Sequence, residues 1–301
     1  MQKRLNAELK YISKKWQMLL MVLPMFVLYV VFRYIPMLKL VICFQDYNIF
    51  KGVYGSSWVG LYQFTRVFSG SEFGKVFGNT ISISLLKVLF GFPSPIILAI
   101  VINEAKGVRF KRICQNIYYL PHFLNWVVLA GVFSSLFALD GLVNDAIQLF
   151  GGEKIFFYKD DYWFRFLLVF TSIYSSIGWG TIIYLAALAG VDVQLYEAAS
   201  LDGASRWQQI KYVTIPSIMS TVLMCFVLGM AGILDAGHDQ ILAMQNDLVL
   251  DTSEIIDTYV YRKGLLKSEY SYSTAVGIFK SSISTVLVII TEALRRKVDE
   301  L

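Results

Sequence analysis

Long apolar stretches dominate the chain. Six of them run approximately over 18–42, 78–103, 116–139, 165–190, 213–235 and 274–294. Each is long enough to cross a bilayer as a helix, which needs about 20 mainly apolar residues. Gly, Ser, Pro and aromatic residues interrupt them, as is typical of helices that pack on one another within a membrane. The pattern therefore predicts an all-α membrane protein with six transmembrane helices, in which 1–301 is a single transmembrane domain.

The composition supports a bilayer as the solvent of this chain. Apolar residues make up 56% of it and charged residues only 16%, whereas a soluble domain carries roughly 25% charged residues. Two histidines and three scattered cysteines, with no Cys-x-x-Cys pair, give no basis for a metal cluster or a redox centre. No composition shift marks an appended soluble domain.

The distribution of basic residues sets an orientation. With the N-terminus inside, the inner segments hold fourteen basic and seven acidic residues, and the outer segments 43–77, 140–164 and 236–273 are richer in acidic residues. The inner basic residues are Lys3, Arg4, Lys10, Lys14, Lys15, Lys106, Arg109, Lys111, Arg112, Arg206, Lys211, Arg295, Arg296 and Lys297. Because cytoplasmic loops carry the positive charge, we expect both termini in the cytoplasm. The net charge of +5 then needs no nucleic acid to explain it.

The predicted inner segment 194–216, between spans four and five, has a distinct local pattern. Residues 194–201 are rich in good helix formers, and Gly203 is well placed to end a short helix. A second, amphipathic helix follows from about 204 and leads to Pro216, where span five opens. The result is a helix-turn-helix on the cytoplasmic surface, a shape suited to a groove on a partner protein.

This segment resembles the EAA signature of ABC-importer permeases. The family pattern is Glu-Ala-Ala, three residues, Gly, nine residues, then Ile-x-Leu-Pro, and the chain has the same spacing with two mild replacements, Val213 and Ile215. In this chain the residues of the motif are Glu197, Ala198, Ala199, Gly203 and Pro216. The Asp202-Gly203-Ala204 triplet is similar to the carbohydrate-uptake branch, and the chain as a whole resembles permeases for oligosaccharides such as alginate or rhamnogalacturonan fragments.

The resemblance implies a transporter subunit with no chemistry of its own. The coupling segment, with Glu197, Ala198, Ala199, Asp202, Gly203, Trp207 and Pro216, would contact a separate ATPase. The chain has no phosphate loop of its own, so ATP and Mg would bind to that partner. Expected partners are a second permease subunit forming a heterodimer, two ATPase subunits and a periplasmic or lipid-anchored solute-binding protein. The implied location is the prokaryotic cytoplasmic membrane, with 1–60 an extra span and outer loop and 74–298 a five-helix core.

Candidate substrate-path residues combine aromatic faces with hydrogen-bonding groups, as sugar sites do. They are Asn125, Trp126, Tyr174, Ser175 and Trp179, together with two cations inside spans, Lys87 and Lys280. Intramembrane cations are costly and often functional, and these two would attract an acidic sugar. Ion pairing between helices, or snorkelling, is the alternative interpretation of both lysines.

Three other classes compete with this interpretation. An amino-acid or peptide ABC permease is the alternative within the ABC class, and the Asp202-Gly203-Ala204 triplet and the extra first span favour a sugar permease over it. An ion-coupled secondary carrier predicts an inverted repeat and carboxylates at mid-span, and the sequence shows neither. A membrane enzyme requires clustered acidic or His residues with a nucleophile or metal, which the spacing does not provide.

Overall fold

The computed structural model describes residues 16–299, and the predicted inner basic residues Lys3, Arg4, Lys10, Lys14 and Lys15 lie outside this range. Within it the secondary structure is almost entirely helical. The helices are α2 (Trp16–Tyr29), α3 (Ile35–Leu38), α4 (Gly52–Gly55), α5 (Tyr62–Ser69), α6 (Ser71–Gly91), α7 (Pro93–Glu104), α8 (Val108–Tyr119), α9 (Trp126–Leu136), α10 (Leu142–Leu149), α11 (Asp161–Ala189), α12 (Val193–Leu201), α13 (Arg206–Gln209), α14 (Ile215–Ala231), α15 (His238–Met244), α16 (Leu250–Ser253), α17 (Ile256–Tyr261) and α18 (Tyr270–Asp299). Strands β1 (Gln45–Asp46) and β2 (Ser57–Trp58) pair in antiparallel fashion.

Five helical stretches of the described chain are long and apolar enough to cross a membrane. They are Leu20–Phe44, Ser71–Glu104, Asp161–Ala189, Arg206–Met230 and Tyr270–Ala293, and a bent pair, α8 with α9, makes a sixth when it is counted as one span. The predicted all-α fold is therefore confirmed. The observed spans extend furthest beyond the predicted ones where polar residues continue a helix past its apolar part. The start of α6 is an example: the predicted span begins at residue 78 and the helix begins at Ser71.

The third predicted span, 116–139, is wrong as a continuous helix. A short 3₁₀ turn, Leu120–Phe123, follows α8, and α9 then leaves at an angle of 106°. Pro121 lies in the turn, and the Asn125 side chain accepts a hydrogen bond from the Val127 N–H at 2.9 Å. Asn125 thus caps a new helix, and hydropathy alone does not register the break.

π-helical turns precede two of the prolines inside long helical stretches. Val30–Tyr34 lies before Pro36, and Ile210–Thr214 lies before Pro216. A proline lacks the N–H for the usual bond, and its ring clashes with the carbonyl four residues earlier, so a wider turn relieves both problems. Pro216 therefore lies within one helical run, Arg206–Met230, and not at the start of a new helix as the sequence suggested.

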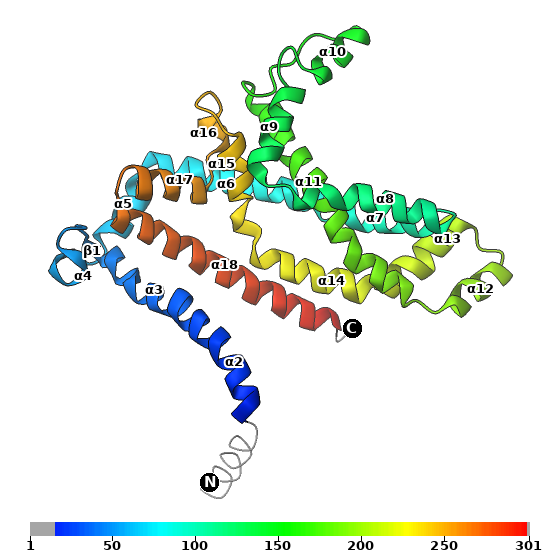
Figure 1. Cartoon of the computed structure of the whole chain (residues 1–301), viewed down its shortest axis with the longest axis horizontal. Coiled ribbons are helices and arrows are strands. Elements are labelled where there is room, and N and C mark those ends of the chain that lie inside the picture. Colours follow the sequence, from blue (N-terminus) through cyan, green and yellow to red (C-terminus); the bar gives the residue numbers. More distant parts are fainter. Residues whose placement is uncertain (1–15, 300–301) are drawn as a thin grey trace, which may run out of the picture.

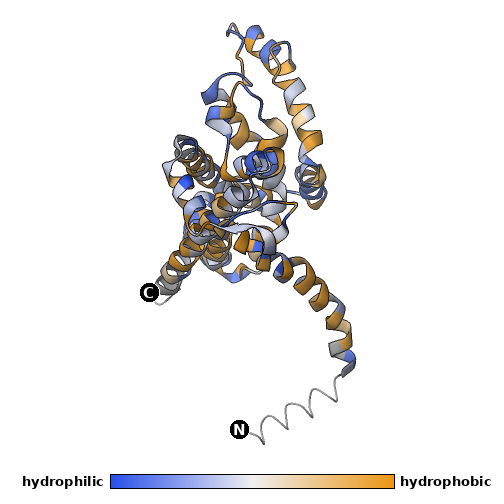
Figure 2. Ribbon diagram, turned by 90° about the vertical axis from the view of Figure 1, so that its left-hand side faces the viewer, coloured by the Kyte–Doolittle hydropathy of each residue, from blue (hydrophilic) through white to orange (hydrophobic). Residues whose placement is uncertain are grey.

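The long helices lie side by side along the longest axis of the molecule (Figure 1). Helices α12 and α13 occupy one end of this axis, and α4 and α5 occupy the other. Helix α18 runs from the α5 end toward the α12 end, while α9 and α10 project sideways from the bundle. Figure 2 shows that α2, which diverges from the body, is strongly apolar along its length.

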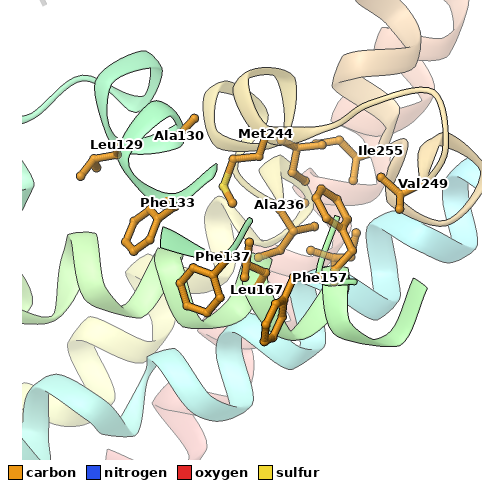
Figure 3. Packing of buried hydrophobic residues seen from close by; sticks show 14 residues of the cluster. Leu129, Ala130, Phe133, Phe137, Phe157, Leu167, Ala236, Met244, Val249 and Ile255 are labelled. Carbon is orange, nitrogen blue, oxygen red and sulfur yellow. The ribbon is translucent and has the colours of Figure 1, made fainter. Parts of the chain in front are cut away.

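The largest buried apolar cluster fixes α9 and α15 against α11. It joins Phe133 of α9, Leu167 of α11 and Met244 of α15, among 14 residues drawn in Figure 3. Thr171 of α11 donates to the Met244 sulfur across 3.6 Å. This packing brings the elbow between α8 and α9 close to the segment that follows α14.

Candidate functional site

Two interruptions of the regular helical backbone meet at one place in the described structure. The first interruption is the elbow between α8 and α9, around Leu124 and Asn125. The second follows α14, where the chain makes a tight turn over residues 232–237 before α15 begins. In this turn Ala236 has a φ of 47° and Gly237 a φ of 86°, both in the left-handed region that glycine tolerates best. Ala236 holds this strained conformation while buried in the main apolar cluster.

A cavity of about 750 Å³ opens between the two interruptions. Its wall combines residues of the α8–α9 elbow, one face of α11 and the start of α15. They are His122, Leu124, Asn125, Trp126, Val127, Ser172, Ser175, Ser176, Gly237, Asp239, Gln240, Leu242 and Ala243. The volume falls in the range of small-molecule sites, roughly 300–1,000 Å³, and the polar groups converge from three elements.

Irregular backbone at this position has a physical meaning. Inside a bilayer, non-helical backbone is tolerated only where it is buried in protein or lines a water-filled cavity. Transporters place such discontinuous helices around their substrate sites. Both breaks, at Asn125 and at Gly237, line the same cavity, which makes it the candidate transport site.

Lys87 of α6 reaches the turn after α14. Its ammonium donates to the Ala236 carbonyl at 2.7 Å and to the side-chain oxygen of Gln240. No carboxylate pairs with Lys87 among the ion pairs of the described residues. Lys87 lines a smaller cavity of about 260 Å³ that shares Ser172 and Gly237 with the larger one.

Gln240 holds the start of α15 against α11. The side chain is 1% exposed, and its amide nitrogen donates to the Leu168 carbonyl at 2.7 Å and to the Thr171 hydroxyl at 2.6 Å. With Lys87 on its oxygen, the amide is satisfied at both ends, so the cavity wall is rigid here.

The structure gathers some of the predicted path residues and separates others. Asn125, Trp126 and Ser175 line the larger cavity. Trp179 does not line the cavity, but its indole stacks on His122, which does, with ring centroids 4.6 Å apart and planes at 8°. Tyr174 packs edge-on against Phe133 at 5.4 Å and is not part of the wall.

Lys280 lies in a different environment from Lys87. Its ammonium is 2.7 Å from Asp235 and within 2.8 Å of both carboxylate oxygens of Asp257. Here the alternative interpretation, an ion pair between helices, describes the geometry. Lys280 lines a separate groove between α18 and the first span, away from the elbow.

The coupling segment folds much as its sequence predicts. Helix α12 begins after Asp192, whose side chain accepts from the Gln194 N–H at 2.9 Å. It ends at a turn in which Gly203 has a φ of 78°. Ser205 and Gln208 then form a reciprocal capping box that starts α13. The segment is therefore built from local interactions.

A few bonds tie the two arms of the coupling segment together. Gln209 is buried and donates to the Ser200 hydroxyl at 2.9 Å, and the Tyr196 and Thr214 hydroxyls are 3.1 Å apart. The tip is exposed: Glu197, Ala198, Asp202 and Gly203 face solvent, and Ala199 is half-buried. Trp207, at 73% exposure, and Leu201, at 90%, present apolar surface with no cover in this chain. Such surface is typical of a protein–protein contact.

The sequence does not show that two parts of the cavity wall come together, the elbow with His122 and the α14–α15 turn with Gly237, Asp239 and Gln240. Their sequence signals are Leu120-Pro121 in one case and Gly232 to Gln240 in the other. The apolar pattern continues through the first interruption, and the second resembles the end of a span, because their convergence depends on how α9 and α15 pack on α11.

Comparison with known proteins agrees with this geometry. Residues 91–300 match the family described as "Binding-protein-dependent transport system inner membrane component". The chain belongs to this family. It is a multi-pass membrane permease component, and its fold is that of an ABC-importer permease.

Individual relatives are similar over nearly the whole permease. The chain is 41% identical to the polygalacturonan/rhamnogalacturonan transport system permease protein YteP of Bacillus subtilis (strain 168), covering 99% of this chain and 93% of that protein. It is 39% identical to Protein LplB of the same organism, covering 95% and 90%. Among solved structures, a bacterial ABC transporter involved in import of the acidic polysaccharide alginate matches with a TM-score of 0.89 at 33% identity, covering 96% and 98%.

Proposed function

We propose that this permease is the membrane subunit of an ATP-driven importer for oligosaccharides, and that the cavity between the α8–α9 elbow and the α14–α15 turn is its substrate site. The observation that carries the proposal is that the bent pair α8–α9 and the turn after α14 line one cavity. Aromatic and hydroxyl groups line it, as a sugar requires. The names of relatives that transport polygalacturonan, rhamnogalacturonan and arabinooligosaccharides support the substrate class.

The substrates are acidic oligosaccharides. Lys87 supports this choice, because it is a membrane-embedded cation next to the cavity whose hydrogen-bond partners, Ala236 and Gln240, are both neutral. A sugar carboxylate would gain a charge-assisted bond there. Lys280 is neutralised by Asp235 and Asp257 and is not part of this proposal. The alginate importer, whose title names an acidic polysaccharide, supports the same class.

The permease works with other subunits. Its exposed coupling segment, with Glu197, Gly203 and Trp207, docks in a groove of an ATPase, which binds ATP and Mg. Two ATPase copies, a second permease and a solute-binding protein complete the transporter. One solved relative is described in complex with an alginate pentasaccharide-bound periplasmic protein, which supports delivery from the side opposite α12. Both termini are cytoplasmic, as is the coupling segment.

A purification experiment tests the assembly. The tagged permease is extracted from its native membranes in mild detergent, and the co-purifying chains are identified by mass spectrometry. The proposal predicts an ATPase with a phosphate loop and a second six-span chain. A permease that purifies alone and transports under an ion gradient in liposomes would instead be a secondary carrier.

A charge substitution tests the substrate class. In the complete transporter, Lys87→Gln should raise KM for an acidic oligosaccharide about tenfold, because a hydrogen bond to a charged group contributes roughly 1.5–3 kcal/mol. Uptake of a neutral oligosaccharide of equal length should change little. Lys75→Gln, at an exposed lysine of α6, is the control. Equal effects on both sugars would show that Lys87 is structural.

A further inference from the structure

A further cavity, distinct from those described above, lies between α6 and α11, and we call it the α6–α11 groove. Its volume is about 440 Å³. Leu86 and Phe90 of α6 form one wall, and Phe166, Phe170 and Ile173 of α11 form the other. Arg165 lies at one end. No part of the proposed transport mechanism uses these residues.

The groove is separate from the transport cavity. On α11 the transport cavity uses Ser172, Ser175 and Ser176, whereas the groove uses Phe166, Phe170 and Ile173. At 3.6 residues per turn, these two sets occupy different faces of the helix. Phe90, Phe166 and Phe170 are 54%, 46% and 42% exposed, so the groove opens sideways from the bundle toward the bilayer.

The Nη1 amino group of Arg165, a residue that lines the groove, is free to bind an anion. Its Nη2 donates to Asn79 at 2.9 Å and to the Thr252 carbonyl at 3.3 Å, and its Nε donates to the same carbonyl at 3.3 Å. Both acceptors are neutral. Among the described residues no carboxylate pairs with Arg165, and its Nη1 has no hydrogen-bond partner in this chain. Nη1 can therefore donate a charge-assisted hydrogen bond to a phosphate.

The length of the groove matches one leaflet. Arg165 lies near the start of α11, at the end of this helix opposite to the one that leads into α12. From Arg165 to Ile173 is eight residues, or about 12 Å at a rise of 1.5 Å per residue. Half of the hydrocarbon core is about 15 Å. At the deep end α6 and α11 approach closely, because a Cβ on Gly91 would lie 3.9 Å from Ile173.

We propose that the α6–α11 groove is a phospholipid site, with the phosphate on Arg165 and one acyl chain along the aromatic walls. The occupant is a lipid of the leaflet away from α12. Three features favour a phospholipid: an apolar groove open to the bilayer, the cation Arg165 at its headgroup end, and the close approach of α6 and α11 near Gly91 and Ile173 at its other end. Tyr162, which is 75% exposed and lies one turn before Phe166, suits the same interfacial depth.

The test measures phospholipid retained by the complete transporter after extensive washing in mild detergent, using native mass spectrometry. Leu86→Trp fills the groove, and Leu85→Trp places the same bulk on the neighbouring residue, which is 56% exposed and does not line the groove. The wild type and Leu85→Trp should each retain one phospholipid per permease copy. Leu86→Trp should retain none.

A second variant, Arg165→Gln, separates headgroup from chain. It should lower phospholipid retention at least tenfold while the other subunits still co-purify. Arg165 also donates to Asn79 and Thr252, so the Arg165→Gln permease could fail to assemble. In that case the comparison of Leu86→Trp with Leu85→Trp still decides whether a phospholipid occupies the groove. Absence of retained lipid in the wild type, or its persistence in Leu86→Trp, would overturn the proposal. Loss of the second permease from Leu86→Trp alone would mean that a protein helix, and not a lipid, covers the groove.

Discussion

The Lys280 ammonium lies 2.7 Å from the Asp235 carboxylate and equally close to Asp257. These three residues come from α18, from the turn after α14 and from α17 respectively. The Lys280 side chain is only 14% exposed and that of Asp257 is 25% exposed. One buried cation therefore fastens the turn that lines the transport cavity to two further helices.

Removal of this cation should destabilise the permease. Lys280→Met leaves two carboxylates without a partner, and breaking a buried ion pair costs about 3–5 kcal/mol. Because the Asp235 side chain is 70% exposed, we expect the loss of stability to lie near the lower end of this range, about 3 kcal/mol. The thermal unfolding temperature of the purified transporter measures it. The double variant Lys280→Met with Asp257→Asn should recover part of the loss, and an unchanged unfolding temperature in the single variant would show that the ion pairs contribute nothing.

A methyl group at Gly237 should disturb the transport cavity. The Cβ of Gly237→Ala would lie 2.6 Å from the Lys87 nitrogen, on a residue whose φ is 86°. Strain at such a position costs roughly 1–3 kcal/mol, so we expect uptake to fall while the subunits still assemble. Gly229→Ala is the matched control, since nothing lies within 4 Å of its Cβ position. Equal uptake by both variants would show that the conformation of the turn at Gly237 does not affect transport.

The turn at Gly203 should be required for coupling. Gly203→Val places a β-branched residue at a φ of 78°, which favours glycine, although the space around it is open. We expect normal insertion but ATP hydrolysis no longer linked to uptake. Gly203→Asn, which tolerates this conformation, should retain most activity. Unaltered uptake in the valine variant would contradict the coupling role, and loss of expression would indicate a purely structural turn.

Trp207 should anchor the ATPase. It is 73% exposed at the tip of the bundle, and buried tryptophans at interfaces typically contribute 2 kcal/mol or more. Trp207→Ala should therefore reduce the ATPase that co-purifies with the permease, without changing the amount of permease in the membrane. Trp58→Ala, at a tryptophan that is 64% exposed near the other end, is the control. Full ATPase retention would place the interface elsewhere.

The parts of this structure that depend on local sequence were predictable. Apolar length is enough to find the spans, and the coupling turn is specified by neighbours such as Gly203 and the Ser205–Gln208 box. The elbow at Asn125 was missed because Leu124, Trp126 and Val127 continue the apolar pattern through the bend. Only Pro121 and the capping side chain mark it.

Residues that depend on tertiary packing were not predictable. Lys87 and Lys280 look alike in the sequence as cations within apolar helices. Their environments differ because Asp235 and Asp257 lie 45 and 23 residues from Lys280, whereas Lys87 meets neutral partners 149 and 153 residues away. The cavity wall likewise joins α9, α11 and α15 only after folding.

One measurement tests the central claim most directly. The purified transporter is reconstituted in liposomes containing ATP and Mg, and uptake of a labelled acidic oligosaccharide is measured with its binding protein outside. The account predicts uptake that requires ATP inside, is abolished by Gly203→Val and is weakened by Lys87→Gln. Uptake that continues without ATP, driven by a proton or sodium gradient, would contradict it.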